Sequence, residues 1–320
     1  MYVEMSKDPD GVVGQPGKIA LSGASGMLGA TLRRRLATRE ARVMQLVRGK
    51  PEGAGQLTWN PSKPTAVADP SALEGYDAAV HLSGASVAAH RWTAEYRREL
   101  KASRVESTRA LATILAGLHN PPRTLIVASA VGIYGDRGEE VLDEASAPGK
   151  GFLADLCQQW EEAATPAAEA GIRVVHTRFG VVLGRGLGAR EQGALEKMLT
   201  VFRAGLGGRL GSGRQWMSWI SLDDAIAAVL FALETRSLAG PVNVVAPNAV
   251  TNAEFTRALA RQVRRPAVLP APAFALRLAL GPMADEALLA SARVVPAKLT
   301  AAGFRFTHAT LEEALAAALG

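Results

Sequence analysis

The sequence predicts an α/β protein in which a doubly wound parallel sheet is followed by a smaller, mixed C-terminal region. Two observations carry this prediction. Short apolar runs alternate with helical patterns up to about residue 184, as in sheets whose parallel strands are joined by right-handed helical crossovers. Beyond that point the alternation gives way to glycine-rich stretches, at 184–193 and 205–213, and to shorter elements.

The expected strands of the sheet are short apolar runs that alternate with helices. They cover residues 18–22, 42–47, 56–59, 78–83, 124–128 and 173–177. The first helix has Leu28, Leu32 and Leu36 at helical spacing, so one of its faces is apolar. Two longer helices are expected at 95–118 and 152–170.

Three helices of the C-terminal region are predicted from capping signals. In each, a Ser or Thr stands three positions before an acidic residue, which is the spacing of a capping box. The pairs are Ser221 and Asp224, Thr251 and Glu254, and Thr310 and Glu313. A short strand is expected between the first two helices, at 241–246.

Glycines at positions 23, 26 and 29 lie between the first strand and the first helix. Such a turn allows the backbone to approach a pyrophosphate closely, and the N–H groups and dipole of the following helix attract phosphate. Gly23, Gly26 and Gly29 therefore predict an NAD(P)-binding Rossmann fold. A P-loop is excluded, because its Gly-Lys-Ser/Thr ending does not occur in the chain.

The end of the second strand distinguishes the two dinucleotides. An acidic residue there binds the ribose 2′-OH of NAD, whereas an arginine pairs with the 2′-phosphate of NADP. This chain has Arg48 at that point and no acidic residue between positions 41 and 51. The sequence therefore predicts NADP(H) as cofactor. The alternative is that Arg48 is a solvated loop residue.

The composition argues against several other classes of protein. The chain has 320 residues, is 48% hydrophobic and carries a formal net charge of +6. Its basic residues are scattered, so we expect no nucleic-acid partner. No apolar run reaches the roughly 20 residues of a membrane helix, and no ligand spacing suggests a metal site. The single Cys157 fits a reducing compartment, so we expect the protein to be cytoplasmic. We also expect a monomer or homodimer that acts on a small molecule.

Further motifs carry a family resemblance. They are Ser-Gly-x-x-Gly-x-x-Gly at 22–29, His-Leu-Ser-Gly at 81–84, Tyr-Gly-Asp at 134–136, Gly-Ser-Gly-Arg-Gln-Trp-Met-Ser-Trp at 211–219 and Trp-Ile-Ser-Leu-Asp-Asp at 219–224. Together they resemble the extended short-chain dehydrogenase/reductases, and more narrowly their atypical, sugar-nucleotide-epimerase-like branch. Residues 268–319 are similar to the C-terminal region of unknown function found in that branch.

The chain accordingly divides into three parts. Residues 1–17 are expected to form a disordered arm, and residues 18–184 the NADP-binding Rossmann domain. Residues 185–320 are expected to form the substrate-binding region, which ends in the family-specific tail. The segment 219–246 is expected to return to the Rossmann domain.

The resemblance implies which residues contact the cofactor. They lie in the glycine turn, at the ends of the second and fourth strands, on the long helix, and after the sixth strand. The set is Gly23, Ser25, Gly26, Met27, Leu28, Gly29, Val47, Arg48, Leu82, Ser83, Gly84, Glu99, Arg104 and Val182.

The expected catalytic residues depart from the superfamily pattern. Typical members use a Ser or Thr after the fifth strand and a Tyr-x-x-x-Lys pair on the next helix, whose phenol transfers the proton. Here Ala130 stands at the serine position, and Leu153 and Cys157 stand at the tyrosine and lysine positions. Ser129 and Tyr134 remain as catalytic candidates. Each has a structural alternative, a backbone hydrogen bond for the serine and a strand-end role for the tyrosine.

Four residues are candidates for contacts to the substrate, because arginine suits a phosphate and a Trp face suits a sugar or base ring. They are Arg91, Arg214, Trp216 and Trp219. The alternative for the two tryptophans is a structural pair beneath a loop. Two functions stay open, an NADP(H)-dependent oxidoreductase or epimerase-like enzyme acting on a carbonyl, alcohol or nucleotide sugar, and a non-catalytic NADP(H)-binding sensor or regulator.

Overall fold

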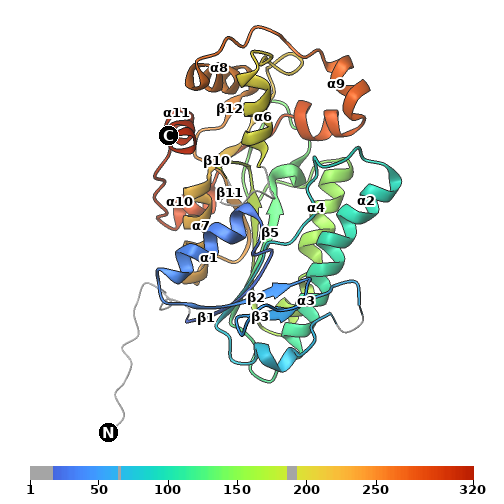
Figure 1. The fold of residues 1–320 in the computed structure, drawn as a ribbon, viewed down its shortest axis with the longest axis vertical. Coiled ribbons are helices and arrows are strands. Elements are labelled where there is room, and N and C mark those ends of the chain that lie inside the picture. The colour runs from blue at the N-terminus through green and yellow to red at the C-terminus, as the bar shows by residue number, and fades with distance from the viewer. Residues whose placement is uncertain (1–16, 64–65, 186–192) are drawn as a thin grey trace.

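The computed structural model describes residues 17–63, 66–185 and 193–320. The predicted disordered arm, apart from Gly17, and most of the glycine-rich stretch at 184–193 lie outside the described residues. The chain forms a sheet with helices on both faces and, above it, a region that contains α6, α8 and α9 (Figure 1).

Seven parallel strands form the central sheet in the order β11-β7-β5-β4-β1-β2-β3. Their bounds are β1 Lys18–Ser22, β2 Arg42–Val47, β3 Gln56–Thr58, β4 Ala78–His81, β5 Thr124–Ala130, β7 Arg173–Phe179 and β11 Gly240–Val244. The strand order reverses between β1 and β4, and dinucleotides bind at such a switch point of a doubly wound sheet. The predicted fold class is confirmed.

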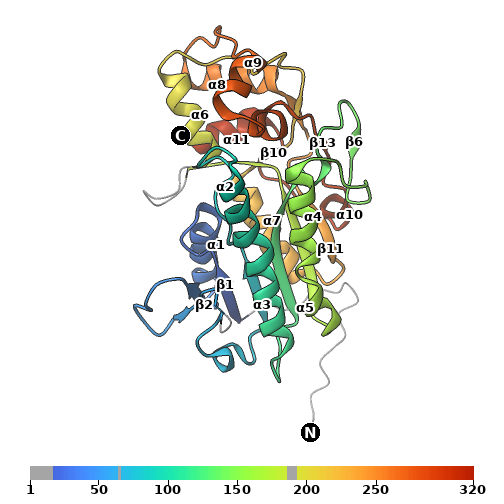
Figure 2. The ribbon, with the colours of Figure 1, turned by 90° about the vertical axis from the view of Figure 1, so that its right-hand side faces the viewer.

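Helices cover both faces of the sheet (Figure 2). One face carries α1 (Met27–Ala37) and α7 (Leu222–Glu234). The other face carries α2 Ala94–Lys101, the π-turn Ala102–Glu106, α3 Ser107–Ala116, α4 Phe152–Glu162 and α5 Thr165–Glu169. The expected helix at 152–170 is therefore interrupted. The break falls before Pro166, whose ring and missing N–H do not allow an uninterrupted helix.

The central strands are buried on both faces, as is usual for parallel sheets covered by helices. All four residues of β4 are buried, including the polar His81. Its Nδ1 lies 2.6 Å from the Ser22 hydroxyl, and its Nε2 lies 3.1 Å from the Ser107 hydroxyl. Burial lowers the pKa of His81 to about 4, so the ring is neutral at pH 7.

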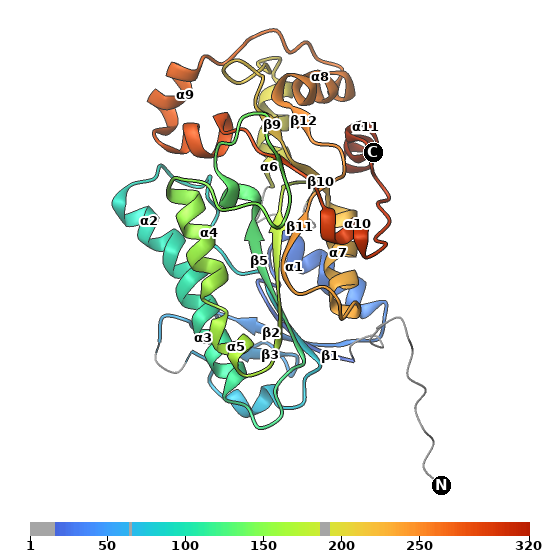
Figure 3. The same cartoon turned by 180° about the vertical axis from the view of Figure 1, so that it is seen from behind.

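The remaining elements connect the sheet to the C-terminal region. They are β6 Val141–Leu142, β8 Val181–Leu183, α6 Ala194–Arg203, β9 Trp216–Met217, β10 Trp219–Ser221, β12 Val250–Thr251, α8 Asn252–Val263, α9 Ala273–Leu280, β13 Arg293–Val294, α10 Ala297–Ala301 and α11 Leu311–Leu319. Short 3-10 turns at Pro70–Leu73 and Val131–Tyr134 and a π-turn at Ala284–Leu289 complete the chain. Seen from behind, α10 lies beside α7 and β11 (Figure 3).

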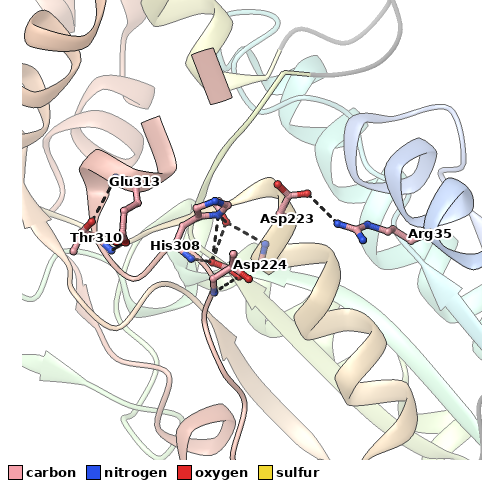
Figure 4. Close-up of polar contacts among 8 residues, drawn as sticks. Arg35, Asp223, Asp224, His308, Thr310 and Glu313 are labelled. Carbon is pink, nitrogen blue, oxygen red and sulfur yellow. Dashed lines mark hydrogen bonds and ion pairs between the residues drawn. The ribbon is translucent and has the colours of Figure 1, made fainter. Parts of the chain in front are cut away.

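Two of the three predicted capping boxes are confirmed, at α8 and at α11. At α7, Ser221 is the predicted N-cap and accepts the Asp224 N–H at 3.1 Å, but the Asp224 carboxylate accepts the Ser221 hydroxyl, at 3.0 Å, and not its backbone N–H, so the capping box is incomplete. The Asp224 carboxylate is fully buried, and its oxygens accept the backbone N–H groups of Thr307 and His308 at 2.8 and 2.9 Å (Figure 4). Asp224 thus fixes a distant segment of the C-terminal tail, which local spacing does not reveal.

The length and apolar character of the helices bear on whether the chain could cross a membrane. Across the ranges that the structure describes, no helix combines the length and apolar character that crossing a bilayer requires.

Candidate functional site

The turn between β1 and α1 is shaped so that only glycine fits at two positions. Gly23 has a φ of +72°, and a Cβ there would lie 2.7 Å from the carbonyl carbon of Leu82. A Cβ on Gly29 would lie 2.1 Å from the carbonyl oxygen of Gly23. Side chains at these positions would therefore force the turn away from the adjacent strand end and helix.

The N-terminus of α1 is left open for a ligand. Its N-cap is Gly26, no side chain caps it, and its first turn contains no acidic residue. By contrast α7, α8 and α11 are each capped by a Ser or Thr and have acidic residues in the first turn. The first N–H groups of a helix have no partner within it and attract phosphate. The glycine cradle and uncapped helix thus fit a dinucleotide pyrophosphate, with Ser25 in the turn and Met27 and Leu28 at the start of α1.

The other cofactor candidates lie mostly at the same carboxyl edge of the sheet. Val47 ends β2, and Arg48 follows it with an exposed side chain that has no hydrogen bond or ion pair to any described residue. Leu82 and Ser83 follow β4 and abut the glycine turn. Val182 lies within β8 and pairs with Ile220.

Arg104 has contacts that organise the loop after β4. Its Nη2 donates to the Ala85 carbonyl at 2.8 Å, and the neighbouring Ser103 hydroxyl accepts the Ala85 N–H at 3.1 Å. A Cβ on Gly84 would lie 3.4 Å from its guanidinium carbon, which also stacks over the Trp160 ring at 5.1 Å. Arg104 therefore shapes the loop that follows β4.

Glu99 lies on α2, five positions before Arg104. Its side chain is exposed, and it has no hydrogen bond in the described part of the chain.

Ser129 belongs to a buried ion-pair network. Arg178 on β7 donates from Nε and Nη2 to the two carboxylate oxygens of Glu161 on α4, both at 2.8 Å. The Ser129 hydroxyl donates to Glu161 at 2.7 Å and is 3% exposed. The hydroxyl is thus held by a carboxylate and not, as the alternative supposed, by its own backbone.

Tyr134 completes this network from the turn after β5. It is fully buried, and its hydroxyl accepts from Arg178 Nη1 at 2.9 Å and lies 2.7 Å from Asn243 Oδ1. Burial raises the pKa of the Tyr134 phenol. This geometry favours the structural alternative over a catalytic acid, because the hydroxyl is fully bonded inside the core.

Arg178 and Asn243 belong to this network but are not among the residues predicted from the sequence. The available signal was a charged or amide residue within an otherwise apolar strand, in Arg-Val-Val-His-Thr-Arg-Phe at 173–179 and in Gly-Pro-Val-Asn-Val at 240–244.

Leu153 and Cys157 occupy neighbouring turns of α4, facing the turn after β5. A Cβ on Gly132 would lie 3.6 Å from the Leu153 Cβ and 3.9 Å from the Cys157 sulfur. Burial raises the pKa of the Cys157 thiol to about 12, so the thiol stays protonated and unreactive at neutral pH. Neither side chain can supply the proton transfer of a Tyr-x-x-x-Lys pair.

A cavity of about 270 Å³ opens beside Leu153. One wall comes from the turn after β5 and the start of α4, and the other comes from the C-terminal tail. The lining residues are Gly132, Gly135, Asp136, Lys150, Leu153, Ala154, Arg277, Asp285, Glu286, Leu289 and Ala290. The cavity therefore combines the Rossmann part of the chain with the tail.

None of the four predicted substrate residues is among those lining residues. Trp219 is fully buried, and its Nε1 donates to the Asn248 carbonyl at 3.0 Å, as in the structural alternative. Trp216 donates to Glu139 at 2.6 Å and lies under Arg293.

The two arginines of the set lie at the surface. Arg91 donates to the Leu278 carbonyl at 3.2 Å and so links the loop after β4 to α9. Arg214 is exposed. Within the described ranges, no three His, Cys, Asp or Glu side chains are grouped so that they could hold a metal ion.

Comparison with known proteins places the chain in a family. The model of the NAD dependent epimerase/dehydratase family matches residues 19–246, and that of a domain of unknown function (DUF1731) matches residues 271–318. The epimerase family protein ML0860 of Mycobacterium leprae is 44% identical over 93% of this chain and 94% of its own. The Bacillus subtilis epimerase family protein YfhF is 36% identical over 93% and 96%.

The solved structures agree with these relatives. The crystal structure of human epimerase family protein SDR39U1 (isoform 2) with NADPH superposes with a TM-score of 0.84 at 32% identity, over 94% of this chain and 99% of that one. MoeE5 in complex with UDP-glucuronic acid and NAD, at 19% identity and a TM-score of 0.73 over 94% and 97%, shares the fold. The chain thus belongs to the NAD-dependent epimerase/dehydratase family, as an NAD(P)-binding, epimerase-like member with a C-terminal DUF1731 domain.

Proposed function

We propose that this protein is an NADP(H)-dependent oxidoreductase that acts on a small carbonyl or alcohol in the cavity beside Leu153. The observation that carries the proposal is the glycine cradle at the uncapped start of α1. It lies at the carboxyl edge of the sheet, where Gly132 and Gly135 in the turn after β5 line the cavity. The bound dinucleotide would supply the hydride donor or acceptor. The residues of the chain would hold it, orient the substrate and move the proton.

The preference for NADP(H) over NAD(H) rests on Arg48. Its guanidinium is exposed at the end of β2 and unpaired within the described residues, so it is available to a 2′-phosphate. The NADPH in the structure of the human relative supports the same choice.

The size of the cavity favours a small substrate over a nucleotide sugar. Its volume of about 270 Å³ lies below the roughly 300–1,000 Å³ of pockets that enclose drug-sized ligands. The tail supplies Arg277, Asp285 and Glu286 to the wall, so we propose that the DUF1731 domain determines which substrate enters.

A second candidate function is a non-catalytic NADP(H) sensor. It is favoured by Leu153 and Cys157, which provide no proton-transfer group at the positions where the superfamily has one.

The cytoplasmic location of the protein and its state as a monomer or homodimer stay predictions of the sequence.

One experiment separates the two functions. Binding of NADPH and NADH is measured by fluorescence, and NADPH oxidation is then followed with small aldehydes, small ketones and a UDP-sugar. Oxidation with a small carbonyl supports the oxidoreductase. Tight NADPH binding without oxidation by any carbonyl supports the sensor, and turnover of the UDP-sugar alone contradicts the proposed substrate size.

A further inference from the structure

Neither of the two predicted catalytic residues lines the cavity. Ser129 and Tyr134 are held inside the ion-pair network of Arg178 and Glu161. We infer that Glu286 of the C-terminal tail is the proton-transfer residue of this cavity, an inference that rests on the proposed oxidoreductase function.

The position of Glu286 is fixed by the start of α4. Its Oε2 accepts the backbone N–H of Leu153 at 2.8 Å, the residue at the position of the usual tyrosine. Gly151, the N-cap of α4, has a φ of +110°, and a Cβ there would lie 3.0 Å from the same oxygen. No side chain of α4 or of the preceding loop caps this helix. The tail therefore places a carboxylate against the helix that carries the catalytic pair in typical members.

The second carboxylate oxygen of Glu286 is free to act. Glu286 is half-buried and lines the cavity, and its Oε1 has no hydrogen-bond partner within the described residues. One oxygen is thus used to hold the side chain in place, and the other remains for a substrate hydroxyl.

The other charged groups of the cavity are less suited to this role. Asp285 pairs with Arg277 at 2.9 Å, and both side chains are at least half exposed. Asp136 accepts the Ser291 N–H at 3.0 Å and so anchors the tail. Lys150, before α4, is exposed. These four groups are the charged neighbours of Glu286 around the cavity.

With an alcohol substrate, the Glu286 carboxylate would take the hydroxyl proton as the C=O bond forms. The oxidised nicotinamide that the cofactor supplies when bound would accept the hydride of the carbinol carbon. In the reverse direction the protonated carboxyl group gives its proton to the carbonyl oxygen. A positioned carboxyl group of this kind contributes on the order of 10²–10⁴-fold to the rate.

The test compares two substitutions of Glu286 in the full-length protein. Glu286→Gln retains an oxygen that can accept the Leu153 N–H but removes the acid–base group, whereas Glu286→Ala removes both. The matched control is Glu313→Gln, since Glu313 also accepts a backbone N–H, from Thr310 at 3.0 Å, at the remote start of α11. Tm, the Kd for NADPH, kcat and the pH dependence of kcat are measured for all four proteins.

We expect Glu286→Gln to keep the Tm and the Kd for NADPH of the wild type while kcat falls by about 100-fold or more. The fall in wild-type alcohol oxidation at acidic pH should be absent from its residual activity. Glu286→Ala should lower Tm by about 2–4 °C as well, because the cap is lost. Glu313→Gln should retain the wild-type kcat and pH profile.

The outcomes that contradict the proposals differ. If the wild type turns over a carbonyl and Glu286→Gln retains its kcat and pH profile, Glu286 is only a helix cap and the inference is wrong. If the wild type binds NADPH but reduces no carbonyl, the oxidoreductase proposal itself fails. If Glu286→Gln loses stability or NADPH affinity together with kcat, its role is structural and the inference is likewise overturned.

Discussion

Arginines 48 and 178 show how position decides what the same side chain does. Arg178 is buried, bonds two carboxylate oxygens of Glu161, and stabilises the junction of β7 and α4. Arg48 is exposed at the carboxyl edge of the sheet with no partner among the described residues. Buried charges must be paired to be tolerated, whereas an exposed, unpaired arginine is free to bind a phosphate.

Substitution of Arg48 should change the cofactor preference without affecting the fold. Arg48→Ala removes a charge-assisted contact to the 2′-phosphate, so we expect the Kd for NADPH to rise by about 10–100-fold, with the Kd for NADH unchanged. Fluorescence titration with both dinucleotides measures the ratio. Arg261→Ala is the control, because Arg261 is 68% exposed on α8 and paired with Glu312. An Arg48→Ala protein that still prefers NADPH would show that another residue binds the 2′-phosphate.

His81 should make the stability of the protein depend on pH. Its pKa is lowered from 6.5 to about 4 by burial, so the unfolded chain binds the proton more tightly and stability falls as the pH drops from about 6.5 to about 4. This pKa difference lowers the free energy of unfolding by about 2–3 kcal/mol between pH 7 and pH 4.5. Urea unfolding at the two pH values measures it.

The matching substitution is His81→Leu, which removes the titrating ring. It should lower the free energy of unfolding at pH 7, because the Ser22 and Ser107 hydroxyls lose their partner. It should also make the loss of unfolding free energy on acidification smaller by the contribution of His81. The exposed His119, changed to Leu, should leave that loss as it is in the wild type. An equal loss in His81→Leu and wild type would contradict the assignment.

At the scale of elements, the difference between capped and uncapped helices favours α1 as the helix that binds the cofactor. In α8 and in α11, a capping box within the helix itself provides hydrogen-bond partners for N–H groups at the N-terminus. The start of α4 is completed by Glu286 from another part of the chain. Only α1, among these helices, begins at a bare glycine with no acidic residue nearby. Its open N-terminus is therefore where we expect the pyrophosphate to bind.

A methyl group at Gly29 should abolish this site. In Gly29→Ala the Cβ would lie 2.1 Å from the Gly23 carbonyl oxygen, so the turn must open and lose its close approach to the pyrophosphate. We expect the rise in Tm on adding NADPH, which reflects binding to the native state, to disappear. Gly53→Ala is the control, since nothing lies within 4 Å of a Cβ there. A normal NADPH-dependent rise in Gly29→Ala would rule out this turn as the binding site.

At the scale of the whole molecule, the C-terminal tail is a structural part of the site. β13 pairs in parallel with β6, and the Ser291 N–H donates to Asp136 at 3.0 Å. Asp224 holds the backbone at residues 307 and 308 (Figure 4). The tail supplies part of the lining of the cavity, so the cavity depends on the docking of the tail against the Rossmann part.

Loss of the Asp224 carboxylate should loosen this docking. Asp224→Ala leaves the part-buried N–H groups of Thr307 and His308 without their acceptor, so we expect the unfolding free energy to fall by about 2–4 kcal/mol. The neighbouring Asp223 is 55% exposed and pairs with Arg35 at 3.4 Å, so Asp223→Ala should cost no more than about 1 kcal/mol. Denaturant unfolding of the two variants measures the contrast. Equal effects would show that Asp224 does not hold the tail.

The sequence alone determined the sheet and the turn that begins the cofactor site. The strands of the Rossmann part were predictable because each is a local apolar run. Gly23, Gly26 and Gly29 were predictable because the turn needs glycines at a fixed, short spacing in the chain. The capping boxes of α8 and α11 were predictable for the same reason, since their partners are three residues apart.

Only the tertiary structure decided which side chains line the cavity and which are buried in the core. In the sequence, nothing distinguishes Tyr134 and Trp219 from aromatic residues at a protein surface. In the structure both are buried and hydrogen-bonded to residues far along the chain. Glu286 gave no local signal, because its partner, Leu153, lies 133 positions away. A local pattern reports what neighbouring residues require of one another, whereas burial and long-range partners arise only when distant segments pack together.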